Sequence, residues 1–253
     1  YPPKKFNICK NHWDKSYTLP TFDLNSSQKE EYDKLLQNMH RLRTKSHIVF
    51  DIRGNTGGNT EYGQNIIKEL FGTRYVEQKM CLYNNEVYVD WRASQGNLQH
   101  IKSLSIKYPE LAVLKKIEEG FSDSIENGEV YYREYRNEDC DNATIRKSDA
   151  NIIVIIDYAN VSAALDFIDG LKITSNNVIL IGQKTRADRL YMEVRGMSLP
   201  SGEGEFYFPI KVYRNRKRED NQPYSPDVEF SDLDNDDSLQ SFVFRKIIPK
   251  ADI

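Results

Sequence analysis

The sequence predicts an α/β protein built on a parallel sheet. Two segments, residues 47–52 and residues 152–156, are apolar enough to be strands that are buried on both faces. A segment with helical spacing follows each of them, one near residue 60 and the other at Ser162. This strand–helix–strand–helix order favours parallel strands that are joined by right-handed crossovers.

Ahead of the first buried segment, the sequence indicates a short strand and a helix. Residues 18–22 are typical of a short strand that ends in a loop. Ser26 or Ser27 can cap a helix that starts near Gln28. The apolar positions of this helix are Tyr32, Leu35, Leu36 and Met39.

The strand at residues 47–52 runs into a glycine-containing turn, Asn55-Thr-Gly-Gly-Asn59, and a helix over residues 60–71 then stops at Gly72. Paired glycines between a strand and a helix let the backbone approach a ligand closely and turn N–H groups into a cleft. A plain tight turn is the alternative. A phosphate-binding loop is disfavoured, because the turn has neither Gly-x-Gly-x-x-Gly nor a terminal Gly-Lys-Ser/Thr.

Residues 73–149 fit the strand–helix pattern less well. Residues 74–80 and 86–91 alternate like strands, and residues 98–120 have helical spacing that a proline interrupts. We therefore expect a single domain over residues 1–253, with an inserted lobe at about 73–149 on the rim of the cleft. A surface insertion without function is the alternative.

Ser162 stands where the strand at residues 152–156 meets the following helix. A hydroxyl in that place lies beside free backbone N–H groups and the positive end of the helix dipole. Acyl-transfer enzymes need this environment, because fixed donors must hold the oxyanion that forms next to the serine. The alternative is that Ser162 only caps the helix, as serines in such places commonly do.

Five short motifs occur between residues 50 and 227. The two longest are Phe50-Asp-Ile-Arg-Gly-Asn-Thr-Gly-Gly58 and Val161-Ser-Ala-Ala-Leu-Asp-Phe167. The other three are Ile179-Leu-Ile-Gly-Gln-Lys-Thr185, Leu199-Pro-Ser-Gly202 and Pro226-Asp227. In content and order, the motifs resemble those of the tail-specific (carboxy-terminal processing) serine peptidases, the group that includes the tricorn core peptidase and the retinol-binding-protein repeats. This resemblance implies a ClpP/crotonase-like core of repeated β-β-α units with an inserted helical lobe.

The resemblance also implies a serine endopeptidase that cleaves peptide bonds through an acyl-enzyme at Ser162. The backbone N–H groups of Ala163 and of Gly57 or Gly58 would form the oxyanion hole. The alternative is a non-catalytic peptide- or ligand-binding module on the same scaffold, as in the retinol-binding-protein repeats. Two departures from the family pattern favour it: Leu165 stands where the family usually has glutamate, and the usual lysine base is missing.

The resemblance leaves the general base for Ser162 open. In the processing peptidases the base is a lysine, and Asp188 stands in its place here. In the tricorn-like branch a glutamate precedes the Pro-Asp motif, and Asp220 holds that position. That branch also uses a histidine from an upstream helix, for which His12 is the nearest candidate. Both aspartates can instead be surface carboxylates or partners in ordinary ion pairs, and the base can also lie upstream of Tyr1.

Composition argues against several other classes of protein. The chain of 253 residues has a hydrophobic fraction of 39% and a formal net charge of −3, so no overall positive field favours nucleic acid. No apolar run approaches the roughly 18 residues that a membrane span needs. The three cysteines allow at most one disulfide. Neither they nor the four histidines have metal-ligand spacing, so we expect no metal and no cofactor.

The predicted partner of this chain is a peptide or protein substrate. Four aromatic residues of the lobe are expected to supply apolar contacts to it, namely Trp91, Tyr131, Tyr132 and Tyr135. Processing peptidases commonly carry a PDZ domain before the core, and we expect none in this chain, which has no room for one ahead of Leu19. The polar start of the chain contains no signal peptide, and the resemblance implies a periplasmic or secreted location. The oligomeric state is left open.

Overall fold

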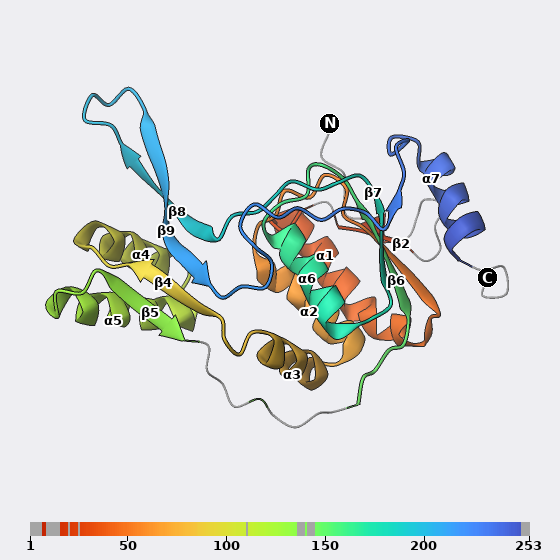
Figure 1. Ribbon diagram of the computed structural model, residues 1–253, viewed down its shortest axis with the longest axis horizontal. Coiled ribbons are helices and arrows are strands. Elements are labelled where there is room, and N and C mark those ends of the chain that lie inside the picture. The colour runs from red at the N-terminus through yellow and green to blue at the C-terminus, as the bar shows by residue number, and fades with distance from the viewer. Residues whose placement is uncertain are drawn as a thin grey trace. The chain divides into compact units, whose positions relative to one another are not determined.

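The computed structural model describes residues 7–8, 16–19, 21–24, 26–109, 111–135, 140 and 145–248. They form two compact units, whose elements are labelled in Figure 1. Unit 1 comprises Tyr1–Tyr83, Asp139–Asp188 and Gln222–Ile253, and unit 2 comprises Asn84–Glu138 and Arg189–Asn221. Each unit is therefore assembled from segments that are far apart in the sequence.

Unit 1 is built on a six-stranded sheet. In spatial order its strands are β1 (Asn7–Ile8), β2 (Ser16–Thr18), β3 (His47–Asp51), β6 (Asn151–Ile156), β7 (Val178–Gly182) and β10 (Val228–Glu229). All neighbouring pairs are parallel except β1 and β2. The predicted α/β class with a parallel sheet is confirmed, and the arrangement is consistent with a ClpP/crotonase-like core. Because β3, β6 and β7 are parallel neighbours, their carboxyl ends lie at the same edge of the sheet.

Helices pack on both faces of this sheet. The helices of unit 1 are α1 (Ser26–Asn38), the short helix η1 (Met39–Thr44), α2 (Thr60–Phe71), α3 (Thr73–Tyr83), α6 (Ala163–Thr174), α7 (Asp236–Phe242) and the short helix η2 (Val243–Ile247). Successive strand residues point to opposite faces. Phe50 and Ile152 thus join a hydrophobic cluster with α1, α2 and α6, whereas Val49 and Ile153 join another with α7 and η2. Burial on both faces explains the continuous apolar runs of β3 and β6.

The segment at residues 74–80, expected to be a strand, is instead part of helix α3. The helix follows the predicted end of α2 at Gly72, and the N–H of Val76 donates to the Gly72 carbonyl at 3.0 Å. Val76 is buried in the core, and α3 packs against α2 and α6. These tertiary contacts select a helix for a short segment whose alternation of apolar and polar residues also suits a strand.

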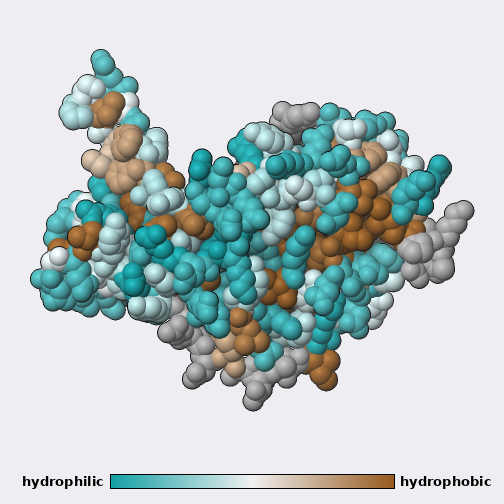
Figure 2. Space-filling model, viewed as in Figure 1, coloured by the Kyte–Doolittle hydropathy of each residue, from teal (hydrophilic) through white to brown (hydrophobic). Residues whose placement is uncertain are grey.

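Unit 2 is a four-stranded antiparallel sheet with two helices. In spatial order the strands are β5 (Tyr131–Tyr135), β4 (Tyr88–Arg92), β9 (Glu205–Arg214) and β8 (Tyr191–Ser198). The helices are α4 (Gln95–Lys107) and α5 (Ala112–Glu126), and their apolar sides meet the sheet around Trp91, Ile101 and Phe121. The β8–β9 hairpin exposes apolar side chains such as Val194 and Phe206. Figure 2 shows hydrophobic surface on this hairpin.

The boundaries expected for the inserted lobe, residues 73–149, need correction. Helix α3 belongs to unit 1, and unit 2 takes its strands β8 and β9 from Arg189–Asn221. Strand β4 pairs with β9, so that Tyr88 stands opposite Arg214. Without β9, strand β4 would be an edge strand with unpaired N–H and C=O groups on one side. The partner that pairs with this side lies more than a hundred residues along the chain.

A disulfide joins Cys81 to Cys140, the cysteine that follows the Asn84–Glu138 segment of unit 2. Both cysteines belong to unit 1, and their Cα atoms are 5.7 Å apart. The bridge therefore connects the two ends of that segment where it leaves unit 1 and returns to it. It is consistent with the expected limit of one disulfide.

Asp90 gives unit 2 a pH-dependent contribution to stability. Its side chain is 5% exposed and accepts hydrogen bonds from Arg133 at 2.7 Å and Arg214 at 3.1 Å. Burial alone would raise the pKa of Asp90, but the two guanidinium groups outweigh burial and hold this pKa below its ordinary value. The contribution is therefore fully present above the unfolded pKa of about 3.9 and is lost as the pH falls through the lower folded pKa.

We expect Asp90→Asn to lower the free energy of unfolding of unit 2 by about 1–3 kcal/mol at neutral pH, because the two arginines lose their negatively charged partner and an NH2 donor replaces one of its two acceptor oxygens. Urea unfolding followed by Trp91 fluorescence, in a Trp13→Phe background, reports on this unit. Glu118→Gln is the control, since Glu118 pairs with Lys102 at 4.0 Å on the surface and should change stability by less than about 0.5 kcal/mol. Equal losses for both variants would contradict the assignment.

Candidate active site

Two loops meet at the carboxyl edge of the unit 1 sheet: the glycine turn, residues 55–59, and the Ser162 loop, residues 157–162, between β6 and α6. In the glycine turn, Gly57 has φ 98° and Gly58 has φ 129°. A Cβ on Gly58 would lie 2.1 Å from the backbone carbonyl carbon of Phe22, and one on Gly57 would lie 2.8 Å from Cβ of Ser162. Both glycines are thus required, because backbone packs directly against them. The turn brings its own backbone against Ser162.

Ser162 precedes helix α6 in a strained conformation. Its φ is 59° and its ψ is −127°, a region that residues with a Cβ rarely adopt. Its side chain makes no capping hydrogen bond to the helix, so the alternative that Ser162 serves as an ordinary cap is wrong. Strain of this kind persists only where the surrounding structure enforces it, and it is common at functional sites.

The N–H groups around Ser162 differ in their availability. The Gly57 N–H donates to Oδ1 of Asn55 at 2.9 Å, so the expectation that Gly57 offers a free donor needs correction. Within the described part of the chain, no acceptor is bonded to the N–H of Gly58 or of Ala163. Ala163 is also the first residue of α6, where the helix dipole is positive. Of the three expected donors, two are therefore free within the described residues, one on each loop.

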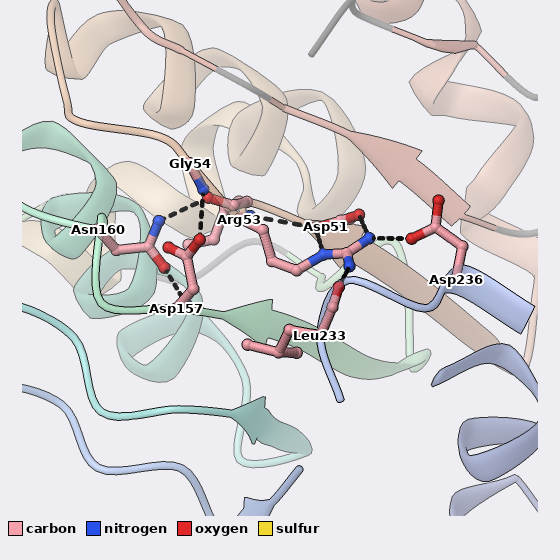
Figure 3. A network of polar contacts seen from close by, with 8 residues as sticks. Asp51, Arg53, Gly54, Asp157, Asn160, Leu233 and Asp236 are labelled. Atoms are coloured by element: carbon pink, nitrogen blue, oxygen red, sulfur yellow. Dashed lines mark hydrogen bonds and ion pairs between the residues drawn. The ribbon is translucent and has the colours of Figure 1, made fainter. Parts of the chain in front are cut away.

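A buried arginine holds the start of the glycine turn (Figure 3). The Arg53 side chain bonds Asp51 through two nitrogens, at 2.9 and 2.6 Å, and Asp236 at 2.8 Å. It also donates to the carbonyl of Leu233. Burial by itself would lower the pKa of Arg53, but its carboxylate partners raise it above the ordinary value. The arginine therefore remains charged and ties the end of β3 to the segment that leads into α7.

Asp157 and Asn160 were not among the predicted site residues, yet they connect the two loops (Figure 3). Asp157 accepts a hydrogen bond from the Gly54 N–H at 2.9 Å. Asn160 donates to the carbonyl groups of Ile52 and Asn55. The sequence contains a local signal for them, because Asp and Asn three residues apart between a strand and a helix indicate a turn with side-chain hydrogen bonds. It contains no signal for the partners across the sheet.

The candidate bases are placed differently. Asp188 is buried in the segment that follows β7, and this segment is bonded to the Ser162 loop through the Arg186 N–H, which donates to the Asn160 carbonyl at 3.1 Å. Asp220 belongs to unit 2, where it accepts from the Leu190 N–H at 3.0 Å and lies 3.7 Å from Arg189. That contact fits the alternative of an ion-pair partner.

The histidines give no further candidate within the described residues of unit 1. His47 begins β3 and His40 lies in η1, which precedes that strand. The Ser162 loop and the glycine turn are at the opposite, carboxyl edge of the sheet. His12 lies outside the described residues, and no group of His, Cys, Asp and Glu among the described residues could hold a metal ion.

The expected substrate contacts divide into buried and exposed residues. Trp91 is 3% exposed and packs in the core of unit 2, with its ring N–H on Glu134 at 2.9 Å, so its assignment as a substrate contact needs correction. Tyr132 is half-buried against Phe121. Tyr131 is 49% exposed. The alternation along β5 turns neighbouring residues to opposite faces of the sheet, which separates these two tyrosines.

The fold is an α/β core with a parallel sheet, and a strained serine precedes a helix at the carboxyl edge of that sheet. A family model, Peptidase family S41, matches residues 17–230. The chain therefore belongs to this family, which indicates a serine peptidase, and the resemblance drawn from the five motifs is confirmed.

Several solved structures are similar to this chain at low identity. Mature CPAF in complex with lactacystin is 12% identical with a TM-score of 0.48, and the match covers 85% of this chain and 46% of that chain. The photosystem II D1 C-terminal processing protease is 16% identical with a TM-score of 0.41, covering 85% of this chain and 42% of that chain. A lipoprotein from Streptococcus agalactiae is 15% identical with a TM-score of 0.48, and the match covers 96% of this chain and 71% of that chain.

The chain thus spans less than half the length of the first two of these proteins. No curated protein matches it in sequence. Among the described residues, no helix combines the length and the apolar character needed to cross a membrane.

Proposed function

We propose that this chain is a serine endopeptidase-like hydrolase that cleaves peptide bonds through an acyl-enzyme at Ser162. The observation that carries the proposal is the strained backbone of Ser162, φ 59°, combined with a hydroxyl that does not cap the helix. An ordinary capping serine needs neither feature. The serine stands at the amino end of α6 with free N–H groups beside it, and membership of the peptidase family supports the same chemistry.

The reaction follows from this arrangement. Oγ of Ser162 attacks the carbonyl carbon of the scissile bond while a base takes the hydroxyl proton. The N–H groups of Gly58 and Ala163 hold the oxyanion. The tetrahedral intermediate then expels the amine, which takes the proton from the base, and leaves an ester on Ser162. Water, deprotonated by the same base, hydrolyses that ester and restores the serine.

Asp188 is the described residue of unit 1 that best suits the role of this base or of its orienting partner. It is buried, and its segment is bonded to the loop that carries Ser162. His12 and Asp220 remain proposals from the sequence.

We infer a peptide or protein substrate and a location outside the cytoplasm. Tyr131 and Tyr135, on the exposed face of β5, offer aromatic surface for apolar side chains. The disulfide between Cys81 and Cys140 favours an oxidising compartment, where such bridges persist. No metal or cofactor enters the proposed reaction.

Covalent labelling tests the proposed nucleophile. A fluorophosphonate probe at neutral pH is expected to modify Ser162 and to leave Ser46 and Ser201 unlabelled, although both of these are exposed. Exposure without activation does not make a serine reactive. Peptide mass spectrometry identifies the adduct. Labelling of all three serines at similar rates would contradict activation at Ser162.

The second candidate function is a non-catalytic peptide-binding module. Leu165 favours it, because this residue is fully buried in the core where the family usually has a glutamate. Calorimetric titration with peptides distinguishes the two functions. Peptide binding without any fluorophosphonate adduct, and unchanged by Ser162→Ala, would support the binding module and reject the peptidase.

A further inference from the structure

Asn160 is fully buried, with 0% exposure, two residues before Ser162. Its Oδ1 accepts a hydrogen bond from the Asp157 N–H at 2.9 Å. Its Nδ2 donates to the Ile52 carbonyl at 2.5 Å and to the Asn55 carbonyl at 3.2 Å. A single side-chain amide thus joins the Ser162 loop to the start of the glycine turn.

The backbone of Asn160 makes a third connection. Its carbonyl accepts a hydrogen bond from the Arg186 N–H at 3.1 Å. The loops that follow β3, β6 and β7, three neighbouring strands of the sheet, therefore meet at this one residue. Because Asn160 has no exposure to solvent, water does not compete for these hydrogen bonds.

The connection matters because the two free donors belong to different loops. The Gly58 N–H is on the glycine turn and the Ala163 N–H is at the start of α6, so no short covalent path fixes their separation. Misplacing an oxyanion donor or a reacting group by about 1 Å costs roughly 100-fold in rate. The close approach of Gly57 to Ser162 also leaves little tolerance, because a Cβ on Gly57 would lie 2.8 Å from the serine Cβ.

We propose that Asn160 is a positioning residue that holds the Gly58 and Ala163 N–H groups at the separation an oxyanion needs. This inference rests on the proposed function. Asn160 touches neither substrate nor reacting atoms. It acts through the backbone of the glycine turn, and it also supports the strained conformation of Ser162, which requires rigid surroundings.

Two variants and a matched control test the role in peptide hydrolysis. Asn160→Ala removes all the side-chain hydrogen bonds, and Asn160→Asp keeps the acceptor for Asp157 but loses the donor. We expect kcat to fall by about 100-fold in both variants, with KM changed by less than about 3-fold, at a temperature where each is folded. Asn151→Ala is the control, because Asn151 links β6 to the Ser46 carbonyl, at 3.4 Å, at the opposite end of the same strand. Its kcat should stay within about 2-fold of the wild-type value.

Hydrogen exchange provides a readout that does not depend on activity. Amides of the glycine turn should exchange at least about 10-fold faster in the Asn160 variants than in the wild-type protein or in Asn151→Ala. If the wild-type protein hydrolyses no peptide but this difference is observed, the proposed function fails. The result would still support the role of Asn160 in holding the glycine turn to the Ser162 loop. Unchanged exchange, or equal losses of kcat in the Asn160 and Asn151 variants, would overturn the proposal. Unfolding of both Asn160 variants would do so as well, since Asn160 would then be a determinant of the fold.

Discussion

Replacing Ser162 with alanine is expected to lower kcat/KM for peptide hydrolysis by about 10⁴-fold or more, because the acyl-enzyme can no longer form. The protein should stay folded. The hydroxyl makes no capping hydrogen bond, and alanine keeps the Cβ that is strained at φ 59°. The free energy of unfolding should therefore change by less than about 0.5 kcal/mol. Hydrolysis of a fluorogenic peptide and urea unfolding measure the two quantities.

Ser162→Gly separates the strain from the chemistry. Glycine adopts a positive φ without steric cost, so this variant should be inactive and yet more stable than the wild-type protein by about 1 kcal/mol. Ser46→Gly is the control, because Ser46 has no positive φ and should lose stability on substitution. An alanine variant that keeps its activity would show that Ser162 is not the nucleophile. A Ser162→Gly variant that is less stable than Ser46→Gly would show that the positive φ of Ser162 does not lower the stability of the wild-type protein.

The largest loss of stability is expected from Arg53→Met. Removing this buried guanidinium leaves Asp51, whose side chain is 13% exposed, without its ion-pair partner. Breaking a buried pair from one side costs about 3–5 kcal/mol, a large share of the roughly 5–15 kcal/mol that stabilises a typical protein. Thermal or urea unfolding of unit 1 followed by circular dichroism measures the loss.

Two further variants distinguish the buried pair from its exposed neighbour. Asp236 is 71% exposed, so Asp236→Asn should cost less than about 1 kcal/mol. The double variant Asp51→Leu with Arg53→Met removes both buried charges and should recover most of the stability lost by Arg53→Met alone. A double variant as unstable as the single one would show that packing, and not the unpaired carboxylate, causes the loss.

The parts of this protein that could be predicted from sequence are those with a local physical cause. Strands β3 and β6 are continuous apolar runs because both faces of the sheet are covered, and Ser162 and the paired glycines mark the two loops at its edge. The five motifs identified the family, which the match over residues 17–230 confirms. Each of these features depends on residues that are close together in the sequence.

Tertiary structure alone decided the features that depend on partners far along the chain. Segment 74–80 is a helix because it packs on α2 and α6. Trp91 is a core residue because its strand β4 pairs with β9 and packs against the helices of unit 2. The Asn55 side chain accepts a hydrogen bond from the Gly57 N–H, whereas the Gly58 N–H stays free among the described residues. Asn160 connects the two loops through its side-chain hydrogen bonds. Spacing along the sequence does not show which backbone groups a side chain will meet across a sheet. The sequence alone therefore located the loop that carries Ser162, while the fold determined which backbone N–H groups lie beside it.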